Sequence, residues 1–135
     1  MFTIKNEVIL IMQIFKANVS KSMELYQRVK FWLEDNQSFT NVYQALSHDD
    51  KLSEKLFHEE ILVAYGFVTG CRARYFERHC FFIEQDEVID VTFNNLHKLE
   101  LQEYTIIELY TFSNYLKAIE YEYRKSLNEM NLQLN

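Results

Sequence analysis

Two residues of this sequence have the types and spacing that general acid–base chemistry requires, namely His79 and Asp90. An imidazole can act as a general base, and a carboxylate hydrogen-bonded to it fixes the tautomer and orientation of the ring. Both residues lie in an apolar, aromatic stretch whose polar break is Gln85-Asp86, a pattern that predicts two short strands joined by a turn. Because a carboxylate inside such a strand needs a hydrogen-bonding partner, we expect the two side chains to interact.

The register of this hairpin decides whether they can meet. A turn of two or four residues sets Glu84 opposite Glu87 and makes His79 and Asp90 diagonal neighbours on one face. A turn of three or five residues places them on opposite faces, unless a bulge corrects the shift. We expect an even turn, since it also sends Phe81 to the side of His79, while Phe82 and Cys80 go to the other side. The alternative is a surface histidine and an aspartate that merely interrupts a strand.

The same stretch resembles the histidine and aspartate strands of the papain-like and transglutaminase-like thiol hydrolase superfamily. Bacterial and phage members often carry a segment of the form His-Ala-Trp, followed by Val-Ile-Asp-Pro-Thr. The matching positions are His79, Val88-Ile89-Asp90 and Thr92. The segment's Ala, Trp and Pro are replaced by Cys80, Phe81 and Val91.

The resemblance covers residues 60 to 110. Those members tend to have a glycine-bearing strand upstream, and residues 63–67 resemble it. Downstream, residues 104–109 resemble the segment with which the next helix of those members begins. We independently expect a strand at 61–68, with Gly66 marking a bulge or a close approach by another element. Thr105 and Glu108 have the spacing of a capping box, so we expect the last helix to begin there and continue to about Met130.

The family chemistry implies a nucleophilic cysteine at a helix N-terminus upstream of the histidine, where the thiolate is favoured. The two cysteines, Cys71 and Cys80, both follow the glycine-bearing strand. Cys80 directly follows His79 and so points to the opposite strand face, whereas Cys71 would lie about 10 Å away unless its loop folds back. Ser20 and Ser22 lie where the nucleophile's helix would begin, but serine there is usually an N-cap. We therefore expect a relative that lacks its nucleophile.

A chain of 135 residues, 48% hydrophobic and 16% aromatic, is expected to form a single domain spanning residues 1–135. Two glycines and no proline favour a compact, helix-rich unit with few tight turns. We expect an α+β fold, in which helices pack on a small antiparallel sheet built from residues 60–94 and a long C-terminal helix closes the fold.

Hydrophobic periodicity predicts where the other elements lie. Residues 3–16 have helical spacing, although their Ile and Val content leaves a strand open as the alternative. A helix is expected from Ser20 or Ser22 to about Asp35. The remaining expectations are an amphipathic helix at 37–47, a turn at 47–50, a short helix carrying Leu52, Leu56 and Phe57, and a loop at 94–98.

The net charge of −6 argues against a general nucleic-acid binder, which needs concentrated Lys and Arg. A basic cluster, Arg72, Arg74 and Arg78, could hold an acidic partner or a phosphate, or it is a solvated loop. Two cysteines form neither a disulfide framework nor a zinc site. His48 and His58 have no recognised metal-ligand spacing, so we read them as surface residues and expect no cofactor.

Free thiols are typical of a reducing compartment. The apolar run at residues 8–12 is too short for a membrane span and lacks the flanks of a signal peptide. We therefore expect a cytoplasmic protein that does not bind membranes.

The last helix is longer than one small sheet needs, and Tyr115, Tyr121 and Tyr123 are suited to contact a partner. We therefore expect a non-catalytic relative that binds another protein. Short, divergent members of this kind suggest a phage or mobile-element inhibitor of a host factor. The alternatives are a structural homodimer and an active hydrolase or acyl-transferase. In the latter, Cys71, Ser20 or Ser22 attacks, His79 is the base and Asp90 orients it.

Overall fold

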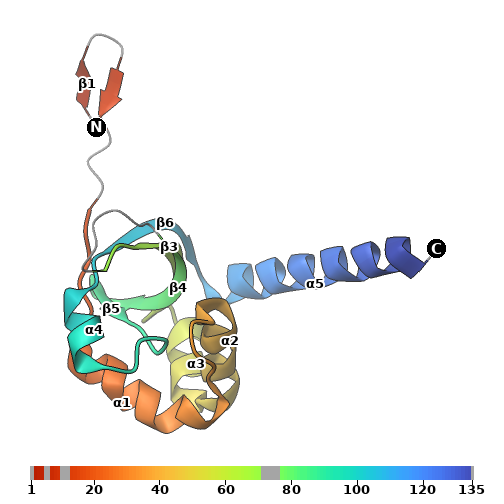
Figure 1. Ribbon diagram of the computed structural model, residues 1–135, viewed down its shortest axis with the longest axis horizontal. Coiled ribbons are helices and arrows are strands. Elements are labelled where there is room, and N and C mark those ends of the chain that lie inside the picture. Colours follow the sequence, from red (N-terminus) through yellow and green to blue (C-terminus); the bar gives the residue numbers. More distant parts are fainter. Residues whose placement is uncertain (1, 5–6, 10–12, 71–76, 135) are drawn as a thin grey trace.

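The structure, a computed structural model, describes residues 2–4, 7–9, 13–70 and 77–134 (Figure 1). Its fold is α+β, which confirms the expected class. The helical elements are α1 (Val19–Val29), η1 (Lys30–Trp32), α2 (Ser38–His48), α3 (Asp50–Phe57), α4 (Leu96–Leu101) and α5 (Phe112–Leu134). The strands are β1 (Phe2–Ile4), β2 (Glu7–Ile9), β3 (Leu62–Val68), β4 (Glu77–Glu84), β5 (Glu87–Ile89) and β6 (Tyr104–Tyr110).

The main sheet is antiparallel, with the strand order β5-β4-β3-β6. Glu84 pairs with Glu87 across a turn formed by Gln85 and Asp86, which have φ angles of 50° and 64°. Two successive positive φ angles are typical of the tight two-residue hairpin turn whose twist matches that of the strands. The predicted even register is therefore confirmed.

An extended segment before α1 joins the two edges of this sheet. The backbone groups of Phe15 and Tyr104 exchange two hydrogen bonds of 2.8 and 3.0 Å. Val88 N donates to Lys16 O at 3.0 Å, and Asn18 N donates to Val88 O at 2.7 Å. Because β5 and β6 are the edge strands, these bonds close the curled sheet into a small barrel (Figure 1).

Residues 104–110 form strand β6, so the expected capping box at Thr105 and Glu108 is wrong. The strand pairs with β3, and the register shifts between Tyr65 and Gly66. A Cβ on Gly66 would lie 1.8 Å from the carbonyl oxygen of Thr105. Both readings of this glycine, a bulge and a close backbone approach, are confirmed.

Two other local expectations are corrected, and one open alternative is decided. The described part of residues 3–16 contains the paired strands β1 and β2 and then the extended segment, so the strand alternative holds there and the helix does not. Helix α1 is capped by Asn18, whose side chain accepts a hydrogen bond from Lys21 N, and not by a serine. The expected loop at 94–98 contains the start of α4, which Asn95 caps.

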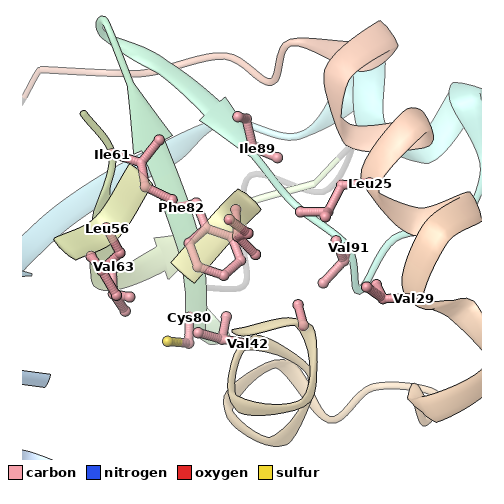
Figure 2. Packing of buried hydrophobic residues seen from close by; sticks show 12 residues of the cluster. Leu25, Val29, Val42, Leu56, Ile61, Val63, Cys80, Phe82, Ile89 and Val91 are labelled. Carbon is pink, nitrogen blue, oxygen red and sulfur yellow. The ribbon is translucent and has the colours of Figure 1, made fainter. Parts of the chain in front are cut away.

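The sheet separates two cores. Helices α1, α2 and α3 pack on its outer face, where Phe82 and Cys80 are buried (Figure 2). Phe81, Val88 and Tyr104 fill the barrel. The predicted separation of Phe81 from Phe82 and Cys80 is therefore confirmed. Among the described helices, none combines the length and the apolar character needed to cross a membrane.

Candidate functional site

His79 and Asp90 meet at the barrel interior. His79 comes from β4, and Asp90 lies one residue beyond the end of β5. The Nε2 atom of His79 is 2.7 Å from Oδ2 of Asp90, and the two side chains are 5% and 1% exposed. The even register produces this contact, because it turns both side chains to one face.

Asp90 forms hydrogen bonds through both carboxylate oxygens and through its backbone N–H. Oδ2 also accepts a hydrogen bond from the Tyr104 hydroxyl at 2.7 Å. Oδ1 accepts one from Thr92 N at 2.9 Å, and Asp90 N donates to Ser22 Oγ at 3.0 Å. Asp90 thus connects α1, β4 and β6 through hydrogen bonds, which is how a buried carboxylate is stabilised.

Tyr104 is held as a hydrogen-bond donor in this cluster. Burial raises the pKa of its phenol well above the ordinary range, and the nearby charge of Asp90 raises it further. The hydroxyl therefore remains protonated at any physiological pH. A protonated phenol can donate to Asp90, so the pKa direction agrees with the observed geometry.

Aromatic rings fix the plane of the imidazole. The ring of Phe93 is stacked on His79 at 4.9 Å between centroids with an interplanar angle of 9°. Phe81 lies at 6.0 Å and 27°. These contacts enclose the ring on the same side of the sheet as Tyr104, and they leave a substrate little access to it.

No thiol or hydroxyl group of the described residues hydrogen-bonds the imidazole. Cys80 lies in the outer core, and burial, with the charge of Asp90, raises its thiol pKa to about 12. Ser20 is exposed on α1, and Ser22 contacts Asp90 and not His79. Cys71 lies outside the described residues, so its catalytic role stays a prediction.

Two polar residues of α2 that the sequence did not single out also reach these strands. Ser38, the first residue of α2, is buried, and its Oγ accepts a hydrogen bond from Cys80 N at 3.1 Å. Asn41 Nδ2 donates to Thr92 Oγ1 at 3.2 Å. These contacts attach α2 beside both members of the His79–Asp90 pair. The available signal was two polar residues, three positions apart, on the apolar face of the predicted helix at 37–47.

A groove of about 1080 Å³ opens between α2, the outer side of β3 and β6, and α5. Cys80 and Val63 are among its lining residues. Glu108, Lys117 and Glu122 are its charged members, and the rest is largely aromatic: Phe39, Tyr43, Tyr65, Tyr110, Tyr115, Tyr121 and Tyr123. The three tyrosines predicted to contact a partner therefore line one groove. Arg72 and Arg74 lie outside the described residues.

The two surface histidines make aromatic contacts. His48 is stacked on Trp32 at 4.0 Å and 4°, and His58 meets Phe57 edge-on at 5.3 Å. Within the described ranges, no three His, Cys, Asp or Glu side chains converge as metal ligands would.

Comparison with protein-family models, curated proteins and solved structures finds no match to this chain.

Proposed function

We propose that this chain is a protein-binding module and that its binding surface is the aromatic groove together with α5. The observation that carries the proposal is the exposure of apolar side chains along a helix that runs away from the body of the molecule (Figure 1). A soluble chain seldom leaves so much contiguous apolar surface uncovered unless a partner covers it.

The beginning of α5 is packed on the body. Tyr115 is half-buried against the outer core, and Phe112 meets Phe57 at 5.6 Å between ring centroids. Farther along, Tyr121 and Tyr123 are 66% and 65% exposed. Tyrosine offers a large contact area at a small cost in side-chain entropy, which makes these two residues suitable interface anchors.

The polar cluster in the barrel fits a structural role within this function. Its carboxylate is fully hydrogen-bonded, its imidazole is buried, and the described residues supply no nucleophile beside it. We propose that the chain is a non-catalytic relative of the papain-like and transglutaminase-like proteins, in which the pair supports the barrel. An inhibitor of a host protein, made by a phage or mobile element and acting in the cytoplasm, is the form of this function that the resemblance suggests.

A Cys or Ser hydrolase or acyl-transferase is the second candidate. The 2.7 Å contact between His79 and Asp90 favours it, because a carboxylate in that position would orient a catalytic imidazole. This candidate requires the thiol of Cys71, which lies outside the described residues, to reach the ring. Labelling of Cys71 by a small thiol-directed electrophile that is lost in His79→Gln would support catalysis and contradict the binding proposal.

The groove is tested by capture of partners on the immobilised chain, followed by mass spectrometry. The double variant Phe39→Ala/Tyr43→Ala removes two half-exposed rings from α2, and we expect it to reduce the captured partner at least about tenfold. Phe31→Ala is the matched control, because Phe31 is 89% exposed and lies outside the groove. Equal capture by the double variant and the native chain would refute the proposal, provided that circular dichroism shows both are folded.

A further inference from the structure

Beyond the body, α5 carries a continuous apolar stripe. Its members are Leu116, Ile119, Tyr123, Leu127 and Met130, which we call the α5 stripe. At about 100° per residue, these five positions lie within about 40° of the direction of Tyr123. Leu116, Tyr123, Leu127 and Met130 are between 40% and 65% exposed. The stripe therefore faces solvent over most of its length.

The spacing of the stripe reads the same from either end. Successive members are three, four, four and three positions apart, so the pattern is symmetric about Tyr123. A two-fold axis at Tyr123 would therefore stack Leu116 on Met130 of a second copy and Ile119 on Leu127 of that copy. A two-fold interface uses the same patch on both partners and must be complementary to itself, a condition that this pattern meets.

The charges beside the stripe agree with the antiparallel orientation. Glu120 and Arg124 lie on one flank, where they form an exposed ion pair of 2.6 Å within the chain. The two-fold axis would bring Glu120 of each copy beside Arg124 of the other. In a parallel pair, the same flank would face the opposite flank of the second copy, and Glu120 would then meet Glu122. Opposite charges next to an apolar seam set the orientation of paired helices.

The length of α5 also indicates which element could cover the α5 stripe. Helix α5 has 23 residues, or about 34 Å. The other helices of the described ranges have eleven residues or fewer. Among the described elements, a matching stripe of equal length is therefore found on α5 of a second copy. At the body end of the stripe, Phe57 is 64% exposed beside Phe112, where the end of the partner's helix would cover it.

We propose that the α5 stripe binds a second copy of this chain, antiparallel and with the two-fold axis at Tyr123. The inference rests on the proposed function, since it names the partner of the α5 part of that surface. It leaves the groove residues of α2 available to a different protein.

The first test measures mass by light scattering over a wide range of concentration. The native chain should approach twice its mass of 16.4 kDa. Tyr123→Asp should weaken association at least about tenfold, because it places two charges at the axis. Lys125→Asp is the matched control: Lys125 is exposed on the opposite face of α5, two positions from Tyr123, and this variant should dimerise like the native chain.

A further variant tests the flank that carries Glu122. The two-fold axis sets this residue near Glu122 of the second copy, and like charges across an interface oppose association. Glu122→Gln should therefore tighten the dimer by up to about threefold, in keeping with an exposed charge pair. Weaker association of this variant would contradict the antiparallel arrangement.

Cysteine cross-linking tests the orientation directly, in a Cys71→Ser background. Chains with Leu116→Cys mixed with chains carrying Met130→Cys should form the mixed disulfide on mild oxidation. Cross-links of Leu116→Cys with itself would show a parallel pair and overturn the proposal. Cys80 should stay unreacted, because its thiol is buried.

The outcomes separate this inference from the proposed function. A chain that stays monomeric at every concentration overturns the inference, and groove-dependent capture of a different protein would then leave the proposed function intact. A monomer whose capture of another protein is abolished by Tyr123→Asp also overturns the inference, because Tyr123, which belongs to both the groove and the α5 stripe, would then contact that protein. A dimer that captures nothing through Phe39 and Tyr43 would uphold the inference and refute the groove.

Discussion

The interior of the barrel and the outer part of α5 differ in how far their side chains are buried and paired within the chain. In the barrel, Asp90 takes part in four hydrogen bonds, and its partners His79 and Tyr104 are buried with it. On α5, Tyr123 and Met130 are more than half exposed. The contrast shows that a histidine–aspartate contact is weak support for catalysis when both side chains are buried and both oxygens of the carboxylate already accept hydrogen bonds. An uncovered apolar stripe, in comparison, is the kind of surface that the proposed binding function would use.

The largest effect is expected from Asp90→Ala. The substitution leaves the imidazole of His79, the hydroxyl of Tyr104 and the N–H of Thr92 without their buried acceptor. We expect a loss of about 3–5 kcal/mol in the free energy of unfolding, measured by urea denaturation. A loss below about 1 kcal/mol would mean that the cluster does not support the barrel, and the contrast with α5 would fail.

Tyr104→Phe should have a smaller effect in the same place. It removes one donor to Asp90 and keeps the ring that packs against Phe81 at 4.9 Å. Because the carboxylate keeps its other hydrogen bonds, we expect a loss of about 1–2 kcal/mol by urea denaturation. An unchanged stability would show that the hydroxyl contributes nothing to the cluster.

Glu84 offers a pH test at the rim of the body. Burial raises the pKa of this carboxyl, but hydrogen bonds from Lys21 at 2.6 Å and Lys55 at 3.0 Å outweigh burial and leave the pKa below its usual value. A lowered folded-state pKa stabilises the fold above the unfolded pKa of about 4.3, and this contribution disappears as the pH falls through the folded value.

Glu84→Gln should therefore cost about 1 kcal/mol at neutral pH, a modest figure because both lysines are nearly half exposed. The stability difference between variant and native chain should close in acid. Urea denaturation at several pH values measures it, and a difference that grows below pH 4 would have the wrong sign.

The smallest effect is expected on α5. Tyr121→Ala removes an exposed ring that lies outside the α5 stripe, so the free energy of unfolding should change by less than about 0.5 kcal/mol. Thermal unfolding at equal protein concentrations measures it. A loss comparable to that of Asp90→Ala would show that this face of the helix is packed on the body, which would remove the distinction between the two regions.

Expectations that depended on neighbouring residues agreed best with the structure. The turn at Gln85-Asp86 and the alternation of Phe81 and Phe82 predicted the register that brings His79 to Asp90. The capping box at Thr105 and Glu108 was a local pattern too, but these residues form strand β6 and not a helix start. Pairing along the free edge of β3 supplied hydrogen bonds that a helix start would have had to forgo.

The full set of Asp90 partners could not be predicted from the sequence. Ser22 is 68 positions away, and Tyr104 comes from a strand that the pattern assigned to a helix. Ser38 had no local signal of its own beyond a polar position on an apolar face, and its contact is 42 positions distant. Such contacts depend on how the chain closes in three dimensions.

By itself, the sequence determined the α+β class, the hairpin register, the helices that cover its outer face and the apolar pattern of α5, because these follow from periodicity and turn chemistry within a few residues. The tertiary structure decided that the segment around Phe15 closes the barrel, that Asp90 is hydrogen-bonded on every side, and that α5 leaves the body. The physical reason is that strand edges, buried acceptors and apolar stripes are satisfied by whichever distant segment the fold brings to them.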